Sequence, residues 1–163
     1  MSKHKTLEEL RENEHTLSWG TIFEWNYDYY IRTMLSFAKE LGRERVVEMI
    51  KHSVEEAHPP NPSPDPNFNF REWMEKGNNG SEDMMVWETV EDTDTAHEIK
   101  VTACLWHDIF SRMGAADIGY ATICHGDFFT CKFRHPKITL YRSKSLMEGH
   151  DCCNHRWVFE KDE

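Results

Sequence analysis

The chain has 163 residues, a length typical of one domain, and its nine Phe, six Trp and five Tyr can build a core. The formal net charge of −10 and the lack of a basic stripe argue against nucleic acid as a partner, because a negative field repels phosphate. No apolar run is long enough to span a membrane and the N-terminus has no signal-type segment, so we expect a cytoplasmic protein with no membrane partner.

The first 58 residues predict helices. The stretch "TLEE" at residues 6–9 has the spacing of a capping box, which indicates a short N-terminal helix. A second helix, ending at Gly42, follows from apolar residues that alternate in steps of four and three: Phe23, Tyr27, Tyr30, Met34, Phe37 and Leu41. This stripe could be core or a subunit interface, so a homo-oligomer is one expectation. Similar spacing predicts a third helix over residues 43–58.

Five of the six prolines follow between residues 59 and 66, and they end the third helix. We interpret residues 59–69 as an extended connector along the surface, because neither flank is a comfortable separate domain. The prediction is therefore one domain over residues 1–163, with N-terminal helices at 1–58 and an α+β region at 85–160.

After the connector the hydrophobic period changes. One or two helical turns are expected at 70–76, a loop at 77–83, strands at 85–91 and 97–103, helices at 105–114 and 116–133, and two final strands between 137 and 160 with a turn near 148–149. The predicted fold class is α+β: N-terminal helices packed with a roughly four-stranded antiparallel sheet that a helical pair interrupts.

Alternation along the last strand separates two sets of side chains. Cys153, His155 and Trp157 share one face with Phe159, and the large rings mark that face as buried. Cys152, Asn154 and Arg156 share the other face, so the adjacent cysteines are not natural disulfide partners, and we interpret Cys152 as a packing residue. An odd count of five cysteines without a secretory signal also favours free thiols.

Arg142 shares a strand face with Ile138 and Leu140 and is therefore expected at the edge of the core. A buried guanidinium needs a carboxylate, a bound anion or water. Glu148, Asp151 or an acid of a neighbouring strand could be its partner, and an anionic ligand is an equal alternative. On the predicted helix at 116–133, two further polar residues lie three apart on one side, Cys124 and Asp127, with Cys131 one turn on.

The stretch "HPKITLYRSKSLMEGHDCCNHRW" resembles the C-terminal signature of the L-2-amino-thiazoline-4-carboxylic acid hydrolase family, and "CLWHDIFSRMGAADIGYATICHGD" is similar to the segment that precedes it. The resemblance covers residues 85–160. It implies that water adds to the ring carbon between sulfur and nitrogen and that the ring opens to an N-carbamoyl-cysteine. As a class this is a hydrolase for non-peptide C–N bonds in small heterocycles, with a small anionic substrate.

Such chemistry needs an acid, a nucleophile or activated water, and an anchor for the substrate carboxylate. Cys153 and His155 could be nucleophile and base, or Asp127 could orient water while His107 donates a proton. Cys124 completes the catalytic candidates. Each of these residues also has a purely structural interpretation, burial for the thiols and a surface helix end for His107. The candidate substrate-binding residues are Arg142, whose planar fork suits a carboxylate, and Arg156.

A second class of function uses soft ligands. The sequence requires no cofactor, but a divalent metal could be held by members of one set: Cys104, His107, Cys124, Cys153 and His155. Their spacing matches no zinc-finger pattern. The alternative to a hydrolase is therefore a non-catalytic protein of the same fold that binds a small ligand or senses a metal or haem.

Overall fold

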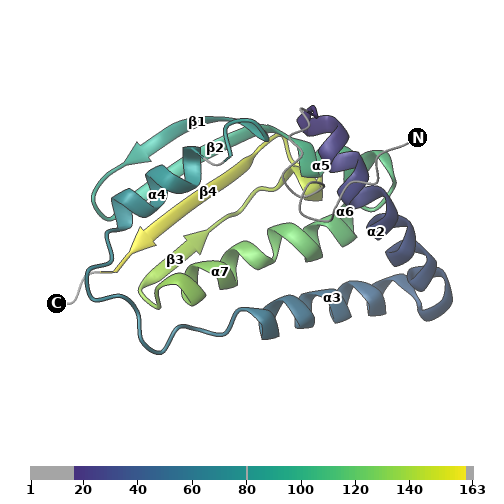
Figure 1. The fold of residues 1–163 in the computed structure, drawn as a ribbon, viewed down its shortest axis with the longest axis horizontal. Helices are drawn as coiled ribbons and strands as arrows, with labels where there is room; N and C mark the ends of the chain where they lie inside the picture. Colours follow the sequence, from purple (N-terminus) through teal and green to yellow (C-terminus); the bar gives the residue numbers. More distant parts are fainter. Residues whose placement is uncertain (1–16, 80, 161–163) are drawn as a thin grey trace, which may run out of the picture.

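The computed structural model describes residues 17–79 and 81–160, with the backbone alone at 78 and 79. The helix expected at residues 6–9 lies outside this range. The elements in chain order are α2 (Trp19–Leu41), α3 (Arg43–Ala57), α4 (Phe70–Asn79), β1 (Met85–Asp92), β2 (Ala96–Cys104), α5 (Leu105–Arg112), α6 (Ala116–Gly119), a π-helical turn (Tyr120–Cys124), α7 (Gly126–Arg134), β3 (Ile138–Tyr141), a 3₁₀ turn (Leu146–Glu148) and β4 (Cys153–Phe159) (Figure 1).

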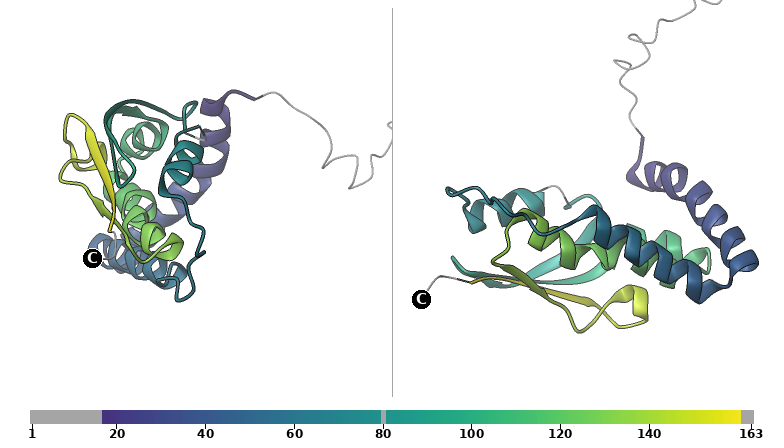
Figure 2. Two further views of the ribbon diagram at one scale, coloured as in Figure 1. Left: turned by 90° about the vertical axis from the view of Figure 1, so that its left-hand side faces the viewer. Right: turned by 90° about the horizontal axis from the view of Figure 1, so that it is seen from below.

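The strands form one antiparallel sheet with the order β1-β2-β4-β3. The described helices lie on one side of this sheet, and no helix or strand of the described residues covers the other side (Figure 2). The predicted α+β class is therefore confirmed. β2 and β4 occupy the centre, where Ile99 is opposite His155 and Val101 is opposite Cys153. This register places the two halves of the α+β region side by side.

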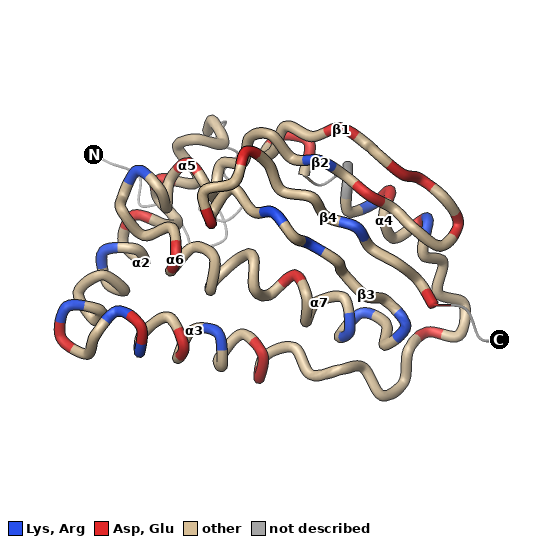
Figure 3. Tube along the Cα trace, turned by 180° about the vertical axis from the view of Figure 1, so that it is seen from behind, with Lys and Arg blue, Asp and Glu red and all other residues tan. Residues whose placement is uncertain are grey.

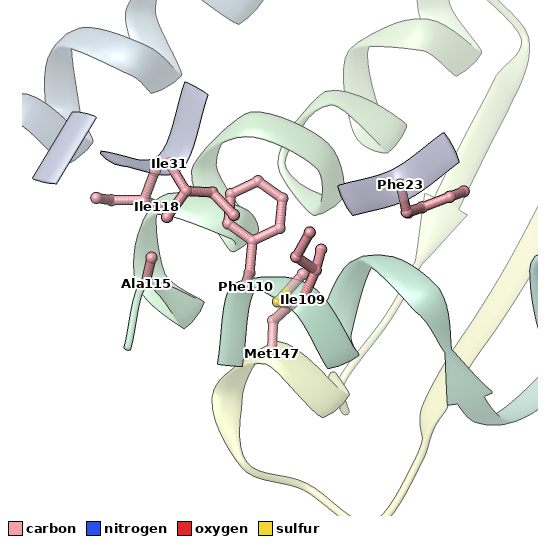
Figure 4. Close-up of a cluster of buried hydrophobic side chains, with 7 residues drawn as sticks. All are labelled: Phe23, Ile31, Ile109, Phe110, Ala115, Ile118 and Met147. Atoms are coloured by element: carbon pink, nitrogen blue, oxygen red, sulfur yellow. The ribbon is translucent and has the colours of Figure 1, made fainter. Parts of the chain in front are cut away.

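The two N-terminal helices meet at Gly42, whose φ of 91° is a conformation that glycine adopts without strain. Of the predicted apolar stripe, Phe23 is buried, and Tyr27, Tyr30 and Met34 pack against the same cluster. That cluster joins α2 to α5, α6 and the 3₁₀ turn through Phe23, Ile31, Ile109, Phe110, Ala115, Ile118 and Met147 (Figure 4). The end of the stripe lies outside the core, because Phe37 and Leu41 are exposed.

α4 is longer than the one or two turns predicted, and the helix includes residues 77–79, which were expected to be loop. Phe70 and Met74 lie one helical turn apart and are both buried against Ile138 and Leu140 of β3. This contact with the sheet stabilises a helix that contains Gly77 and has little intrinsic tendency to continue.

The segment predicted as one helix at 116–133 is helical but is not a regular α-helix. α6 leads into a π-helical turn, in which the amide of His125 donates to the carbonyl of Tyr120, and α7 follows. A π turn inserts extra backbone into a helix and is often found at functional sites. The π turn ends three residues before Asp127.

The uncovered side of the sheet carries charge, and Figure 3 shows acidic and basic residues along β1, β2 and β4. Lys100 and Glu88 are 3.1 Å apart, and the Arg156 guanidinium lies 2.8 Å from Glu91. Ion pairs at such exposed positions add little stability but keep an uncovered face hydrated. Within the described residues, no helix combines the length and the apolar character needed to cross a membrane.

Candidate active site

A cavity of about 220 Å³ lies between α4, α7 and the sheet. Most of its wall is apolar: Trp73 and Met74 come from α4, Met85 from β1, Ile99 from β2, Cys131 from α7 and Trp157 from β4. Ser81, Asp127 and Thr130 supply its polar side chains. Among the described residues of the wall, Asp127 is the one whose side chain carries a charge. An apolar cavity with a single convergent acid is a typical small-molecule site.

Asp127 lies in the first turn of α7 and faces this cavity. Its side chain is 41% exposed, yet protein surrounds the carboxyl group, and this desolvation raises the pKa of Asp127 to about 6. The 41% of the side chain that is exposed faces the cavity, whose wall includes Asp127, while protein atoms surround the rest of the carboxyl group. Arg142 opposes the shift through its charge and its hydrogen bond. The carboxyl group can therefore change protonation state near neutral pH.

Arg142 lies behind Asp127, away from the cavity, and its side chain is 1% exposed. Nη1 donates to Oδ2 of Asp127 at 2.8 Å, and Nη2 donates to the backbone carbonyl of Cys124 at 2.7 Å. The rings of Phe128 and Tyr120 lie 4.7 Å and 5.5 Å from the guanidinium carbon. The predicted inward direction of Arg142 is thus confirmed. The expected partners Glu148 and Asp151 are wrong, because the acid comes from α7.

His155 lies beside this pair. Its Nε2 is 3.1 Å from Nη1 of Arg142 and 3.8 Å from Oδ2 of Asp127, and its ring stacks on Trp157. Desolvation and the charge of Arg142 lower the pKa of His155 to about 3, so the imidazole is neutral at pH 7. Because a guanidinium only donates, Nε2 is the acceptor and the ring proton belongs on Nδ1. Nδ1 is buried, and no described residue bonds to it.

All five cysteines are free thiols. Cys153 is buried, and its Sγ accepts a hydrogen bond from the amide of Leu146 at 3.2 Å. Burial raises the pKa of the thiols of Cys153 and Cys104, and raises that of Cys124 to about 12. Neutral thiols beside a neutral imidazole do not resemble an activated thiolate pair. Cys152 is buried, as its interpretation as a packing residue predicted.

Four of the predicted site residues gather around one centre: Cys124, Asp127, Arg142 and His155. Arg156 does not join them, because it lies on the uncovered face, paired with Glu91. His107 is in the first turn of α5, and no contact among the described residues links its imidazole to Asp127. Within the same residues, no three His, Cys, Asp or Glu side chains are arranged to hold a metal ion. The predicted set of metal ligands therefore gains no support from the arrangement of these side chains and stays a prediction.

The cavity wall does not follow from the sequence patterns. Trp73 and Met74 lie in a stretch expected to form one or two helical turns, and Ile99 was treated only as part of a strand. The signal was present, because Phe70 and Met74 are spaced for one helical face and Ile99 alternates with Val101. Neither pattern predicts that this face of α4 and this face of β2 lie opposite each other.

The fold and the site define an α+β protein with an acid–arginine–histidine cluster beside an apolar cavity. The chain belongs to the L-2-amino-thiazoline-4-carboxylic acid hydrolase family, whose model matches residues 22–157. The match includes most of α2, all of α3 and the proline connector, which the motif resemblance at 85–160 left out. The family name implies a hydrolase. No curated protein matches the chain.

Proposed function

We propose that the protein is a hydrolase that opens a small heterocyclic amidine or thioimidate, of the 2-amino-thiazoline type, with Asp127 as the general base. One observation carries this proposal: the only charged side chain in the described wall of the cavity is a carboxyl group whose pKa is raised to about 6. A base with a pKa just below neutral pH is largely ionised and still accepts a proton readily. The family membership supports the same class of reaction.

The proposed step balances as follows. Water adds to the ring carbon between sulfur and nitrogen, a C–O bond forms, and Asp127 takes a proton from the water. The electron pair of the ring C=N bond moves to nitrogen, which takes up that proton. The added hydroxyl group then loses its own proton and forms C=O as the C–S bond breaks with its electron pair on sulfur. This second proton ends on sulfur, so the products are a thiol and a urea. An N-carbamoyl product requires this C–S cleavage, whereas cleavage of the ring C–N bond would leave the carbamoyl group on sulfur.

The other members of the cluster position Asp127. The Arg142 guanidinium holds Oδ2 of the acid, and the carbonyl of Cys124 and the ring of His155 hold the guanidinium. This leaves Oδ1 for water, since no hydrogen bond from a described residue reaches it. A thiolate route through Cys153 and His155 is the less favourable alternative, because burial opposes both of the charges that it would need.

The test is turnover of 2-amino-2-thiazoline and its 4-carboxylate, with the product examined by mass spectrometry and by titration of the released thiol. Asp127→Asn should lower kcat by about 100-fold or more, the usual contribution of a general base. The circular dichroism of the variant should match that of the wild type. A variant that folds and retains full turnover would remove Asp127 from the reaction.

A further inference from the structure

The polarity of the cavity bears on which heterocycle it accepts. The Arg142–Asp127 pair is oriented, with the guanidinium buried behind the acid and the carboxylate at the cavity wall. A ligand in the cavity therefore meets the negative end of the pair first. The Arg142 side chain is 1% exposed and does not line the cavity, so a ligand carboxylate there does not meet its guanidinium.

The described residues of the remaining wall offer no compensating cation, because they include no Lys, Arg or His. Trp73 and Trp157 present aromatic rings to the space, and Met74, Met85 and Ile99 add apolar surface. Indole rings attract cations, whereas an anion in an apolar wall loses its hydration without a partner.

The size of the cavity agrees with a substituted ring. A volume of about 220 Å³ holds roughly seven water molecules at the liquid share of about 30 Å³ each. A five-membered aminothiazoline does not fill it, so space remains beside the ring. The apolar wall is suited to an alkyl or aryl group in that space.

We propose that the cavity selects a cyclic amidine that is cationic at neutral pH and carries an apolar group, instead of a carboxylate, beside the ring. The amidinium would donate to Oδ1 of Asp127 and lie against the indole rings. This inference rests on the proposed function for the reaction, but it concerns the substrate class and has a binding test of its own. It departs from the carboxylate substrate in the family's name and from the expectation that Arg142 or Arg156 anchors an anion.

The test is isothermal titration of the full chain with three ligands, 2-amino-2-thiazoline, its 4-methyl derivative and L-2-amino-thiazoline-4-carboxylate, at a pH above the Asp127 pKa. The methyl derivative should bind at least about tenfold more tightly than the carboxylate, the effect of one unfavourable charge contact. Asp127→Asn should reduce this ratio towards one.

A gain of function gives the matched control. Thr130 is exposed at the wall and takes no part in the cluster. Thr130→Lys would add a cation and should move the preference towards the carboxylate, whereas Thr130→Gln, which is long and polar but uncharged, should move it much less.

The outcomes separate the two proposals. Tighter binding of the methyl derivative supports the substrate class, and it does so even if no ligand is turned over, a result that would reject the hydrolase alone. Equal or tighter binding of the carboxylate by the wild type overturns the substrate class, and turnover of that ligand would leave the hydrolase standing. Absence of binding by all three ligands overturns the substrate class and, together with absent turnover, the hydrolase.

Discussion

Replacement of Arg142 by Met tests how the acid is held. Arg142→Met puts an unbranched apolar side chain in place of the arginine. It removes the charge, the hydrogen bond to Asp127 and the hydrogen bond to the Cys124 carbonyl. Removal of one partner from a buried ion pair costs about 3 to 5 kcal/mol. We expect about 3 kcal/mol, because Asp127 is 41% exposed and retains access to the cavity.

The cost should depend on pH in a defined direction. The pKa of Asp127 is raised from 3.8 to about 6 in the folded wild type. The free energy of unfolding of the wild type therefore falls as the pH rises from 3.8 to about 6, and Asp127 causes no further fall above that pH. Arg142 lowers this pKa by its charge and its hydrogen bond. In Arg142→Met the pKa of Asp127 is therefore higher still, and the cost continues to grow above pH 6. Each added pKa unit contributes about 1.4 kcal/mol.

The assay is urea unfolding of wild type and variant at about pH 5 and about pH 8, on either side of the wild-type pKa. The difference in the free energy of unfolding should be larger at the higher pH. In an Asp127→Asn background the part of the pH dependence that comes from Asp127 should disappear. The part due to His155, whose pKa Arg142 also lowers, and the part due to the carbonyl of Cys124 should remain. Equal differences at both pH values in the wild-type background would refute the assignment of Asp127 as the acid that Arg142 stabilises.

Three further predictions concern chemistry and packing. The rate of turnover should rise with pH through about 6 as Asp127 ionises, and a fall across that range would indicate that the protonated acid is the active form. Cys153→Ala should keep kcat within a few-fold of the wild type, because its thiol is protonated and buried; a loss of about 100-fold would instead support the thiol route. Gly119→Ala should lower the free energy of unfolding by about 1 to 3 kcal/mol, because a Cβ at this position would lie 2.6 Å from the Phe110 ring. In the control variant Gly77→Ala the new Cβ meets nothing within 4 Å, so thermal unfolding should show no loss of stability or a gain.

The sequence by itself determined the elements and the facing of individual side chains. Spacing of four and three located α2 and α3, and alternation along β4 predicted that Cys153, His155 and Trp157 turn inward while Arg156 turns outward. The same reasoning identified Arg142 as an arginine at the edge of the core. These inferences succeed because helix and strand periods are local properties of the chain.

The tertiary structure alone decided which of these surfaces meet. Asp127 and Arg142 come from a helix and the end of a strand, and nothing in either segment specifies the other as its partner. The length of α4, the π turn before α7 and the cavity between them also depend on contact with the sheet. The chemistry follows from this packing, because the desolvation that raises the pKa of Asp127 and lowers that of His155 exists only where several elements together exclude water.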